Sequence, residues 1–252
     1  MACQGCREGG DFPIAITTAF HPIVDVTTGE PFAYEALVRG VNGESAGEVL
    51  AHVTDENRYT FDQLCRVTAI REAVAAGLLE GQAKLSINFL PNAVYSPLAC
   101  IQLTLKTAGE CGMPADRLIF EFTENERLEP AHMRSIIDAY RKLGFATALD
   151  DFGAGHAGLG LLANLQTDMI KLDMELIRGI DQSVPRRQIV SCMVRLCEEM
   201  GMTVIAEGVE TPAELRVIKE IGVRPVQGYV FGRPTVGQLI RPGLAEGLRT
   251  AA

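Results

Sequence analysis

The sequence predicts an α/β fold in which strands and helices alternate. Short β-rich runs alternate with longer stretches whose apolar residues recur every three and four positions, as in repeated βα units around a mostly parallel sheet. Eight such β-rich runs occur in the chain. Its 252 residues are about the length of one complete (β/α)8 barrel, and its 47% apolar residues suffice for one large core.

Strands are expected at 14–18, 33–39, 84–89, 117–123, 145–150, 168–172, 202–206 and 225–230. Helices are expected at 60–76, 130–143, 186–200 and 212–221, and a short extra helix at 44–53. Pro130 and Pro212 stand where a first helical turn accepts proline. Without repeats, low-complexity segments or a Pro/Ser-rich linker, we expect one domain over 12–241, with 1–11 and 242–252 as tails.

The charge balance limits the classes of partner. Lys and Arg total 23 against 32 Asp and Glu, and the net charge of −9 argues against a surface that holds DNA, RNA or anionic lipid. A small phosphate ligand remains possible, because one metal site can reverse the local field. No apolar run approaches the roughly 18–20 residues that span a bilayer, and the first residues lack the apolar stretch of a signal peptide. We therefore expect a cytoplasmic protein without a membrane segment.

The seven cysteines are expected to be reduced thiols, because their number is odd and low for a disulfide scaffold of this length. Five lie in mixed apolar segments and are interpreted as small core residues. Cys3 and Cys6 form a C-x-x-C pair, which could be half a zinc site or a redox pair. No second pair completes a tetrahedral set, so an inert tail is the favoured interpretation.

Polar side chains recur near the carboxyl ends of the predicted strands, where the active site of a parallel barrel lies. From the second strand to the eighth they are Glu35, Asn88, Glu121, Asp150 with Asp151, Lys171, Glu207 and Gln227. A single such residue would be explained as a helix cap or turn former. That explanation does not account for five carboxylates and an amide on apolar strands, because a buried charge costs several kcal/mol unless it is paired or bound to metal.

Hard divalent cations are the favoured partners of this set. Mg²⁺ and Mn²⁺ prefer carboxylate and amide oxygens, which Glu35, Asn88, Glu121, Asp150, Asp151 and Glu207 supply. The adjacent Asp150 and Asp151 allow a bridging carboxylate between two ions about 3.5–4 Å apart, which would activate a water for attack on phosphorus. A purely structural ion is the alternative.

Five short motifs, in order along the chain, resemble the EAL family of cyclic di-GMP phosphodiesterases. They are Glu35-Ala36-Leu37, DDFGAG at 150–155, IKLD at 170–173, AEGVE at 206–210 and QGYVFGRP at 227–234. The resemblance runs from about residue 14 to 240. It implies a modified TIM barrel with one antiparallel strand, and hydrolysis of cyclic di-GMP to linear pGpG with Mg²⁺ or Mn²⁺.

The resemblance also implies roles for single residues. Glu35, Asn88, Glu121 and Asp150 would hold one metal ion, and Asp150 and Asp151, with Glu207 nearby, the second. Lys171 would hold or deprotonate the attacking water and Gln227 would orient it. Arg39 would contact phosphate, and Glu124 and Glu210 would steady the loop after Asp151. For Lys171 a buried ion pair with Asp173 or a neighbouring strand is the alternative, for Arg39 a solvated position, and for the two glutamates ordinary helix-starting acids.

Two segments depart from the family pattern. His21 stands where the family has Gln, so a nucleotide contact would change in kind, or His21 is a structural histidine. After the two aspartates, His156-Ala157-Gly158 replaces a Tyr-Ser-Ser run and removes hydroxyls that could fix the loop.

The leading hypothesis is a metal-dependent phosphodiesterase. The alternatives are a receptor that binds cyclic di-GMP without cleaving it, and an unrelated barrel enzyme acting on a sugar phosphate. The uncharged segment 154–165, rich in small and apolar residues, is expected either to form a homodimer contact or to pack under the next strand. Regulatory input is expected through that dimer or from a separate sensory chain.

Overall fold

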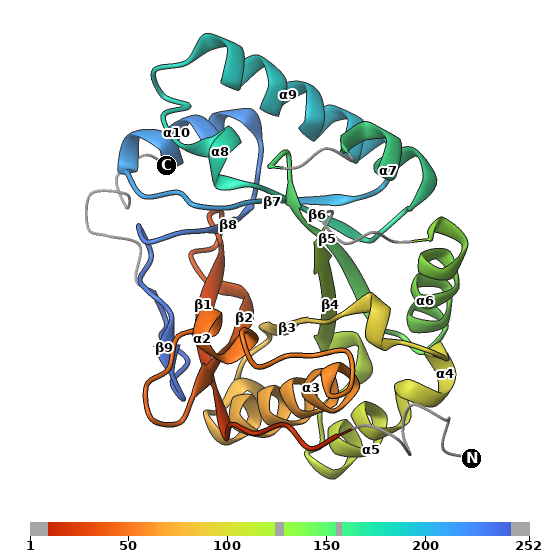
Figure 1. Cartoon of the computed structure of the whole chain (residues 1–252). Helices are drawn as coiled ribbons and strands as arrows, with labels where there is room; N and C mark the ends of the chain where they lie inside the picture. The colour runs from red at the N-terminus through yellow and green to blue at the C-terminus, as the bar shows by residue number, and fades with distance from the viewer. Residues whose placement is uncertain (1–9, 124–128, 155–157, 243–252) are drawn as a thin grey trace.

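The computed structural model describes residues 10–123, 129–154 and 158–242, and its centre is a closed barrel of eight strands surrounded by helices (Figure 1). Around the barrel the strands follow the order β2, β3, β4, β5, β6, β7, β8 and β1, and β1 pairs with β2 to close it. Their bounds are β1 Ile16–Asp25, β2 Pro31–Gly40, β3 Lys84–Asn88, β4 Leu118–Thr123, β5 Ala146–Phe152, β6 Met169–Leu172, β7 Thr203–Ala206 and β8 Pro225–Gln227. The predicted α/β barrel is confirmed.

One barrel strand, β1, runs antiparallel to both of its neighbours, β2 and β8. It is ten residues long, where the sequence predicted a strand at 14–18 only, and residues 26–30 alone connect it to β2. So short a connection makes a hairpin, because a parallel pair needs a crossover of a dozen or more residues. The expected single antiparallel strand is confirmed. An additional short strand, β9 (Thr235–Val236), pairs with Ala19 and Phe20 in the N-terminal half of β1 and was not predicted.

The helices cover the outside of the barrel, and their ends carry the expected signals. The longer ones are α3 (Arg58–Ala75), α5 (Gln102–Glu110), α6 (Pro130–Lys142), α9 (Val184–Glu199) and α10 (Pro212–Ile221). Both predicted prolines occupy first turns, and Thr211 and Glu214 form a capping box on α10. The predicted extra helix is present as α2 (Ala46–Leu50), shorter than expected. Helix α5 and the short helices α4 (Pro97–Cys100), α7 (Gly158–Asn164) and α8 (Met174–Ile177) were not predicted.

An apolar layer fills the lower part of the barrel interior. It consists of Ile23, Ala33, Ile119, Ala148, Met169 and Ile205, which come from six different strands and are nearly or fully buried. A second and much larger apolar cluster lies between the strands and the outer helices. The lower layer is called the apolar floor below, because the polar side chains of the next section stand directly on it.

Among the helices that the structure describes, none is long and apolar enough to cross a membrane. The described cysteines Cys65, Cys100, Cys111, Cys192 and Cys197 are free thiols, as expected. Cys3 and Cys6 lie outside the described residues.

Candidate active site

Strand periodicity places the polar residues above the apolar floor. Side chains two positions apart on a strand point to the same face. Each of five charged residues follows a floor residue by two: Glu35, Glu121, Asp150, Lys171 and Glu207 follow Ala33, Ile119, Ala148, Met169 and Ile205. Asn88 and Glu121 are directly opposite each other on β3 and β4. The sequence prediction that these side chains meet is therefore correct.

A β-bulge in β5 brings two adjacent carboxylates to the same site. Neighbouring residues of a regular strand point to opposite faces, so Asp150 and Asp151 would diverge. The pairing register between β5 and β6 shifts between Leu149 and Phe152, and Asp151 has a φ of 54°. This left-handed backbone is uncommon outside glycine, although aspartate tolerates it better than most residues. With the bulge, oxygens of Asp150, Asp151 and Glu207 lie within 4.8 Å of one another.

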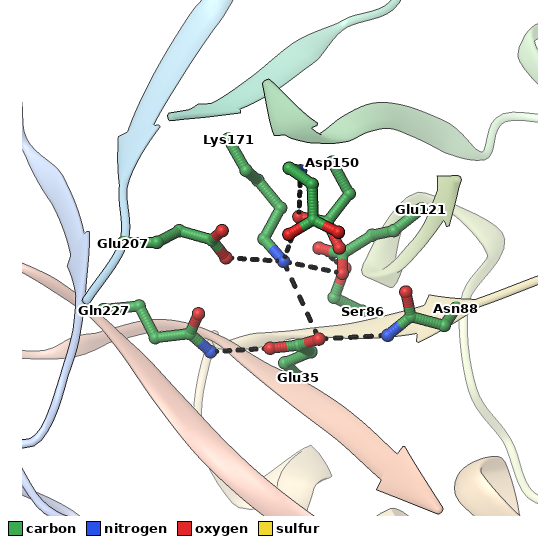
Figure 2. Close-up of polar contacts among 9 residues, drawn as sticks. Glu35, Ser86, Asn88, Glu121, Asp150, Lys171, Glu207 and Gln227 are labelled. Atoms are coloured by element: carbon green, nitrogen blue, oxygen red, sulfur yellow. Dashed lines mark hydrogen bonds and ion pairs between the residues drawn. The ribbon is translucent and has the colours of Figure 1, made fainter. Parts of the chain in front are cut away.

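The ammonium of Lys171 lies among four carboxylates (Figure 2). Its Nζ is 2.7 Å from Glu207, 2.9 Å from Asp150, 3.0 Å from Glu121 and 3.7 Å from Glu35. The lysine side chain is 1% exposed. The alternative of a buried ion pair is thus realised in its second form, with carboxylates on neighbouring strands and not with Asp173. Lys171 can still act on a bound substrate, because its Nζ atom lies beside these four carboxylates of the site.

Amide side chains hold Glu35 from both sides. Asn88 Nδ2 donates to Oε1 of Glu35 at 2.9 Å, and Gln227 Nε2 donates to Oε2 at 2.8 Å. The Ser86 hydroxyl donates to Glu121 from the same face of β3 as Asn88, as Figure 2 shows. Ser86 is a site residue that sequence reasoning missed. Its position two residues before Asn88 was the available signal.

Burial dominates the ionisation of three of the carboxylates. It raises the pKa of Glu121 to about 8, since Lys171 offsets only part of the lost hydration and Glu35 and Asp150 add repulsion. Burial and the charge of Asp150 raise the pKa of Asp151 to about 6. The pKa of Glu207 lies well above its ordinary value, mainly because of burial. Without cations, burial therefore favours the protonated forms of these three carboxyl groups.

Glu35 and Lys171 are charged in spite of burial. Burial alone would raise the pKa of Glu35, but the Lys171 ammonium and the hydrogen bonds from Gln227 and Asn88 hold it below its ordinary value. Burial alone would lower the pKa of Lys171, but the surrounding carboxylates raise it well above its ordinary value. Lys171 is consequently a hydrogen-bond donor in this arrangement.

The donor set fits divalent cations. Five ionised carboxylates against one ammonium would leave four negative charges, which two divalent cations would neutralise. Oxygens of Glu35, Glu121 and Asp150 lie within 4.8 Å of one another and form a second possible cluster, which shares Asp150 with the first. All donors are oxygens, which suits hard ions such as Mg²⁺ and Mn²⁺.

A cavity of about 300 Å³ opens over the carboxylates. His21, Glu35, Asp150, Asp151, Lys171, Glu207 and Gln227 line it, together with residues that sequence reasoning did not select, among them Arg178 and Tyr229. Arg178 donates to Glu210 at 2.8 Å, and the Arg233 guanidinium lies 4.2 Å from the Tyr229 ring centroid. Acidic groups thus line the cavity together with the Lys171 ammonium, the Arg178 guanidinium and the Tyr229 ring.

Comparison with known proteins supplies the family. The model of the EAL domain matches residues 15–234, which include every polar residue of the cavity. The chain belongs to the EAL domain family. Its Glu35-Ala36-Leu37 is the tripeptide that resembles the family motif, and it stands on β2 with Glu35 pointing into the barrel.

Relatives of this EAL domain include the Escherichia coli proteins BluF, a blue light- and temperature-regulated antirepressor, and PdeN, a probable cyclic di-GMP phosphodiesterase. BluF is 32% identical over 85% of this chain and PdeN 28% over 86%. The matches cover 53% and 43% of those relatives, so the chain spans about half of their length.

Solved structures show the same architecture. A standalone EAL protein from Vibrio cholerae O395, in its c-di-GMP bound form, is 45% identical, with a TM-score of 0.89 over 96% of this chain and all of that one. Klebsiella pneumoniae BlrP1, in a manganese and cyclic di-GMP complex, is 35% identical, with a TM-score of 0.83 over 90% of this chain and 57% of that one.

Of the remaining predicted site residues of the EAL domain, His21 and Glu210 line the cavity. His21 on β1 lies opposite Glu35, its Nε2 has no hydrogen-bond partner among the described residues, and burial lowers its pKa. Arg39 is half-buried on β2 and donates to the Val38 carbonyl at 2.7 Å. Glu210 pairs with Arg178, and Glu124 lies outside the described residues. The substrate and loop roles assigned to these residues stay predictions.

Proposed function

We propose that this EAL domain hydrolyses cyclic di-GMP to linear pGpG with two divalent ions, Mg²⁺ or Mn²⁺. One observation carries the proposal: a set of five carboxylates, three buried and two half-buried, with a single ammonium, open to a cavity. The name of the relative PdeN and the ligands named for the Vibrio and Klebsiella structures support the substrate and the metal. When bound, the ions would stabilise negative charge on the phosphodiester and lower the pKa of water.

The chain's own residues would position the reactants. Glu35 would keep its orientation through Asn88 and Gln227, and Asp150 would be shared between the two cation positions. Lys171 would donate a hydrogen bond to the attacking water and Gln227 would help to orient it. Water would add across one P–O3′ bond, leaving a 5′-phosphate and a free 3′-hydroxyl. Arg39 would contact a phosphate, and His21 would offer Nε2 to the nucleotide.

The test is chromatography of the nucleotides formed with Mg²⁺, with Mn²⁺ and with a chelator. We expect pGpG with either metal and intact substrate with the chelator. Glu35→Gln keeps the side-chain volume and removes one charge, so it should lower turnover at least 100-fold. Glu220→Gln, at an exposed position of α10, is the matched control and should retain full turnover. Unreacted cyclic di-GMP at saturating Mn²⁺ would refute the proposal.

The second candidate function is a cyclic di-GMP receptor without hydrolysis. It is favoured by a BlrP1 structure described with cyclic diGMP and no metal ions, and by the name of BluF, an antirepressor. Equilibrium binding of intact nucleotide in the presence of Mn²⁺, without product, would support the receptor.

We also propose that the active form is a homodimer that contacts its second copy through the segment 154–165. Leu159 on α7, 60% exposed, supports this contact. A separate sensory chain remains an alternative source of regulation.

A further inference from the structure

A buried ion pair lies outside the active site, between helix α3 and the ends of strands β3 and β4. Asp62 and Arg66 are one helical turn apart on α3, and Arg66 Nε is 2.8 Å from Asp62 Oδ2. Their side chains are 1% and 0% exposed. A buried pair of this kind adds little net stability compared with apolar residues of the same shape. Its contacts, however, lead to a residue of the proposed metal site.

The contact is made by the other oxygen of Asp62. The backbone N–H of Leu90 donates to Oδ1 at 2.9 Å. Strand β3 ends at Asn88, and only Phe89, whose N–H donates to the Glu121 carbonyl at 3.0 Å, separates it from Leu90. Asp62 therefore fixes the chain two residues beyond Asn88, where the regular ladder has ended.

Arg66 holds the Asp62 carboxylate in place, because contacts with other residues fix the Arg66 guanidinium. Its Nη1 donates to the Tyr140 hydroxyl at 2.9 Å, and its guanidinium carbon is 5.3 Å from the ring centroids of both Phe89 and Phe120. A flat guanidinium among aromatic rings has few other positions. Asn88 and Glu121 point into the barrel from the residues next to these two phenylalanines, so the same strand ends carry both groups.

We propose that Asp62, supported by Arg66, is a positioning residue of the proposed metal centre. It holds the end of β3 so that Asn88 keeps its oxygen and its amide in register with Glu35. This inference rests on the proposed function, which gives Asn88 its place in a metal site. The hydrogen bond from Leu90 to Asp62 that anchors the end of β3 does not need the metal.

The test distinguishes a loss of Asn88 positioning from a general loss of fold stability. In the double variant Asp62→Leu with Arg66→Met, apolar side chains replace the pair, so the fold should persist while Leu90 loses its partner. Asp62→Asn keeps an oxygen for Leu90 and loses the charge that faces Arg66. Ile70→Ala is the matched control, because Ile70 is fully buried on the same helix and its side chain can neither donate nor accept a hydrogen bond.

Two measurements are made on the whole chain: amide hydrogen exchange of residues 85–90 without metal, and calorimetric titration with Mn²⁺. We expect faster exchange at Leu90 in the double variant and Mn²⁺ affinity weakened about 10- to 100-fold, the usual cost of losing a group that orients a metal ligand. Asp62→Asn should fall between the double variant and the wild type. Ile70→Ala should lower the melting temperature and leave both readouts at this strand end unchanged.

Wild-type exchange at Leu90 and wild-type Mn²⁺ affinity in either Asp62 variant that folds would overturn the proposal. Equal weakening of Mn²⁺ binding by Ile70→Ala would also overturn it, because general destabilisation would then be sufficient. If the wild-type chain bound no Mn²⁺, the proposed metal function would fail, and hydrogen exchange alone would decide the anchoring.

Discussion

At the scale of single residues, the site depends on one amino group that keeps several carboxylates together. Lys171 is within 3.0 Å of Glu121, Asp150 and Glu207, and without it these charges would face one another in a buried space. The sequence located these residues because strand ends converge in a barrel. The bulge at Asp151 was not predictable, since two adjacent aspartates alone do not indicate a left-handed backbone or say that both side chains share a face.

Lys171→Met should destabilise the metal-free protein by about 3–5 kcal/mol, because it removes one partner of a buried ion network. Mn²⁺ should restore part of this loss, since cations replace the missing charge. Turnover should fall about 10²- to 10⁴-fold if Lys171 orients the water. Denaturant unfolding with chelator and with Mn²⁺, together with product assays, measures these effects. Lys142→Met, at an exposed position of α6, is the control, and unchanged metal-free stability of Lys171→Met would contradict the account.

At the scale of elements, the structure differs most from the sequence prediction where a turn changes the strand direction. The alternation of apolar residues located the parallel strands and main helices, because each βα unit repeats one pattern. The same alternation predicted a first strand at 14–18 only, because His21 and Pro22 interrupt the β-rich run. Recognising the turn at 26–30 as a hairpin would have identified β1 as the antiparallel strand.

Glu214 ties the start of α10 to Gly179, which follows α8. Its carboxylate accepts hydrogen bonds from the N–H groups of Gly179 at 2.8 Å, Thr211 at 3.0 Å and Glu210 at 3.1 Å. Burial opposes ionisation, but these donors hold the pKa of Glu214 below its ordinary value. A depressed folded-state pKa stabilises the protein above the unfolded pKa of about 4.3, and this contribution is lost as pH falls through the folded value.

Glu214→Gln should therefore cost roughly 1–2 kcal/mol at pH 7. The difference from wild type should shrink as the pH is lowered from 5 towards 3. Urea unfolding at a series of pH values measures it, with the exposed Glu220→Gln as the reference variant. An equal difference at pH 7 and pH 3 would show that ionisation of Glu214 has no part in stability.

Gly228 lets two strand ends approach each other closely. A Cβ at this position would overlap the backbone of Val209, whose N–H donates to the Gln227 carbonyl at 3.1 Å. Gly228→Ala should cost roughly 1–3 kcal/mol through overpacking and lower turnover, because Gln227 would move away from Glu35. Gly109→Ala, in open space on α5, should retain turnover. Thermal unfolding and product assays compare the two variants. Full turnover in Gly228→Ala would show that this backbone contact does not position Gln227.

At the scale of the whole molecule, exposed apolar side chains bear on assembly. Leu159 on α7 is 60% exposed, and it lies in the segment proposed for the dimer contact. Leu159→Asp should shift a dimer to a monomer in sedimentation and lower the specific activity, while the melting temperature changes little. Leu103→Asp, which alters another exposed leucine on α5, should do neither. A wild-type monomer whose specific activity is independent of concentration would refute the dimer.

The apolar floor determines the route that ligands take. Because Ile23, Ala33, Ile119, Ala148, Met169 and Ile205 close the lower end of the barrel, substrate and product of the proposed reaction would share the one opening that the described residues leave. A barrel filled in this way has no rear exit. At the proposed site the linear dinucleotide would therefore have to leave the cavity before the next cyclic dinucleotide could bind. Accumulated product would compete with fresh substrate for the same space, so that the end product of the reaction restrains its own formation.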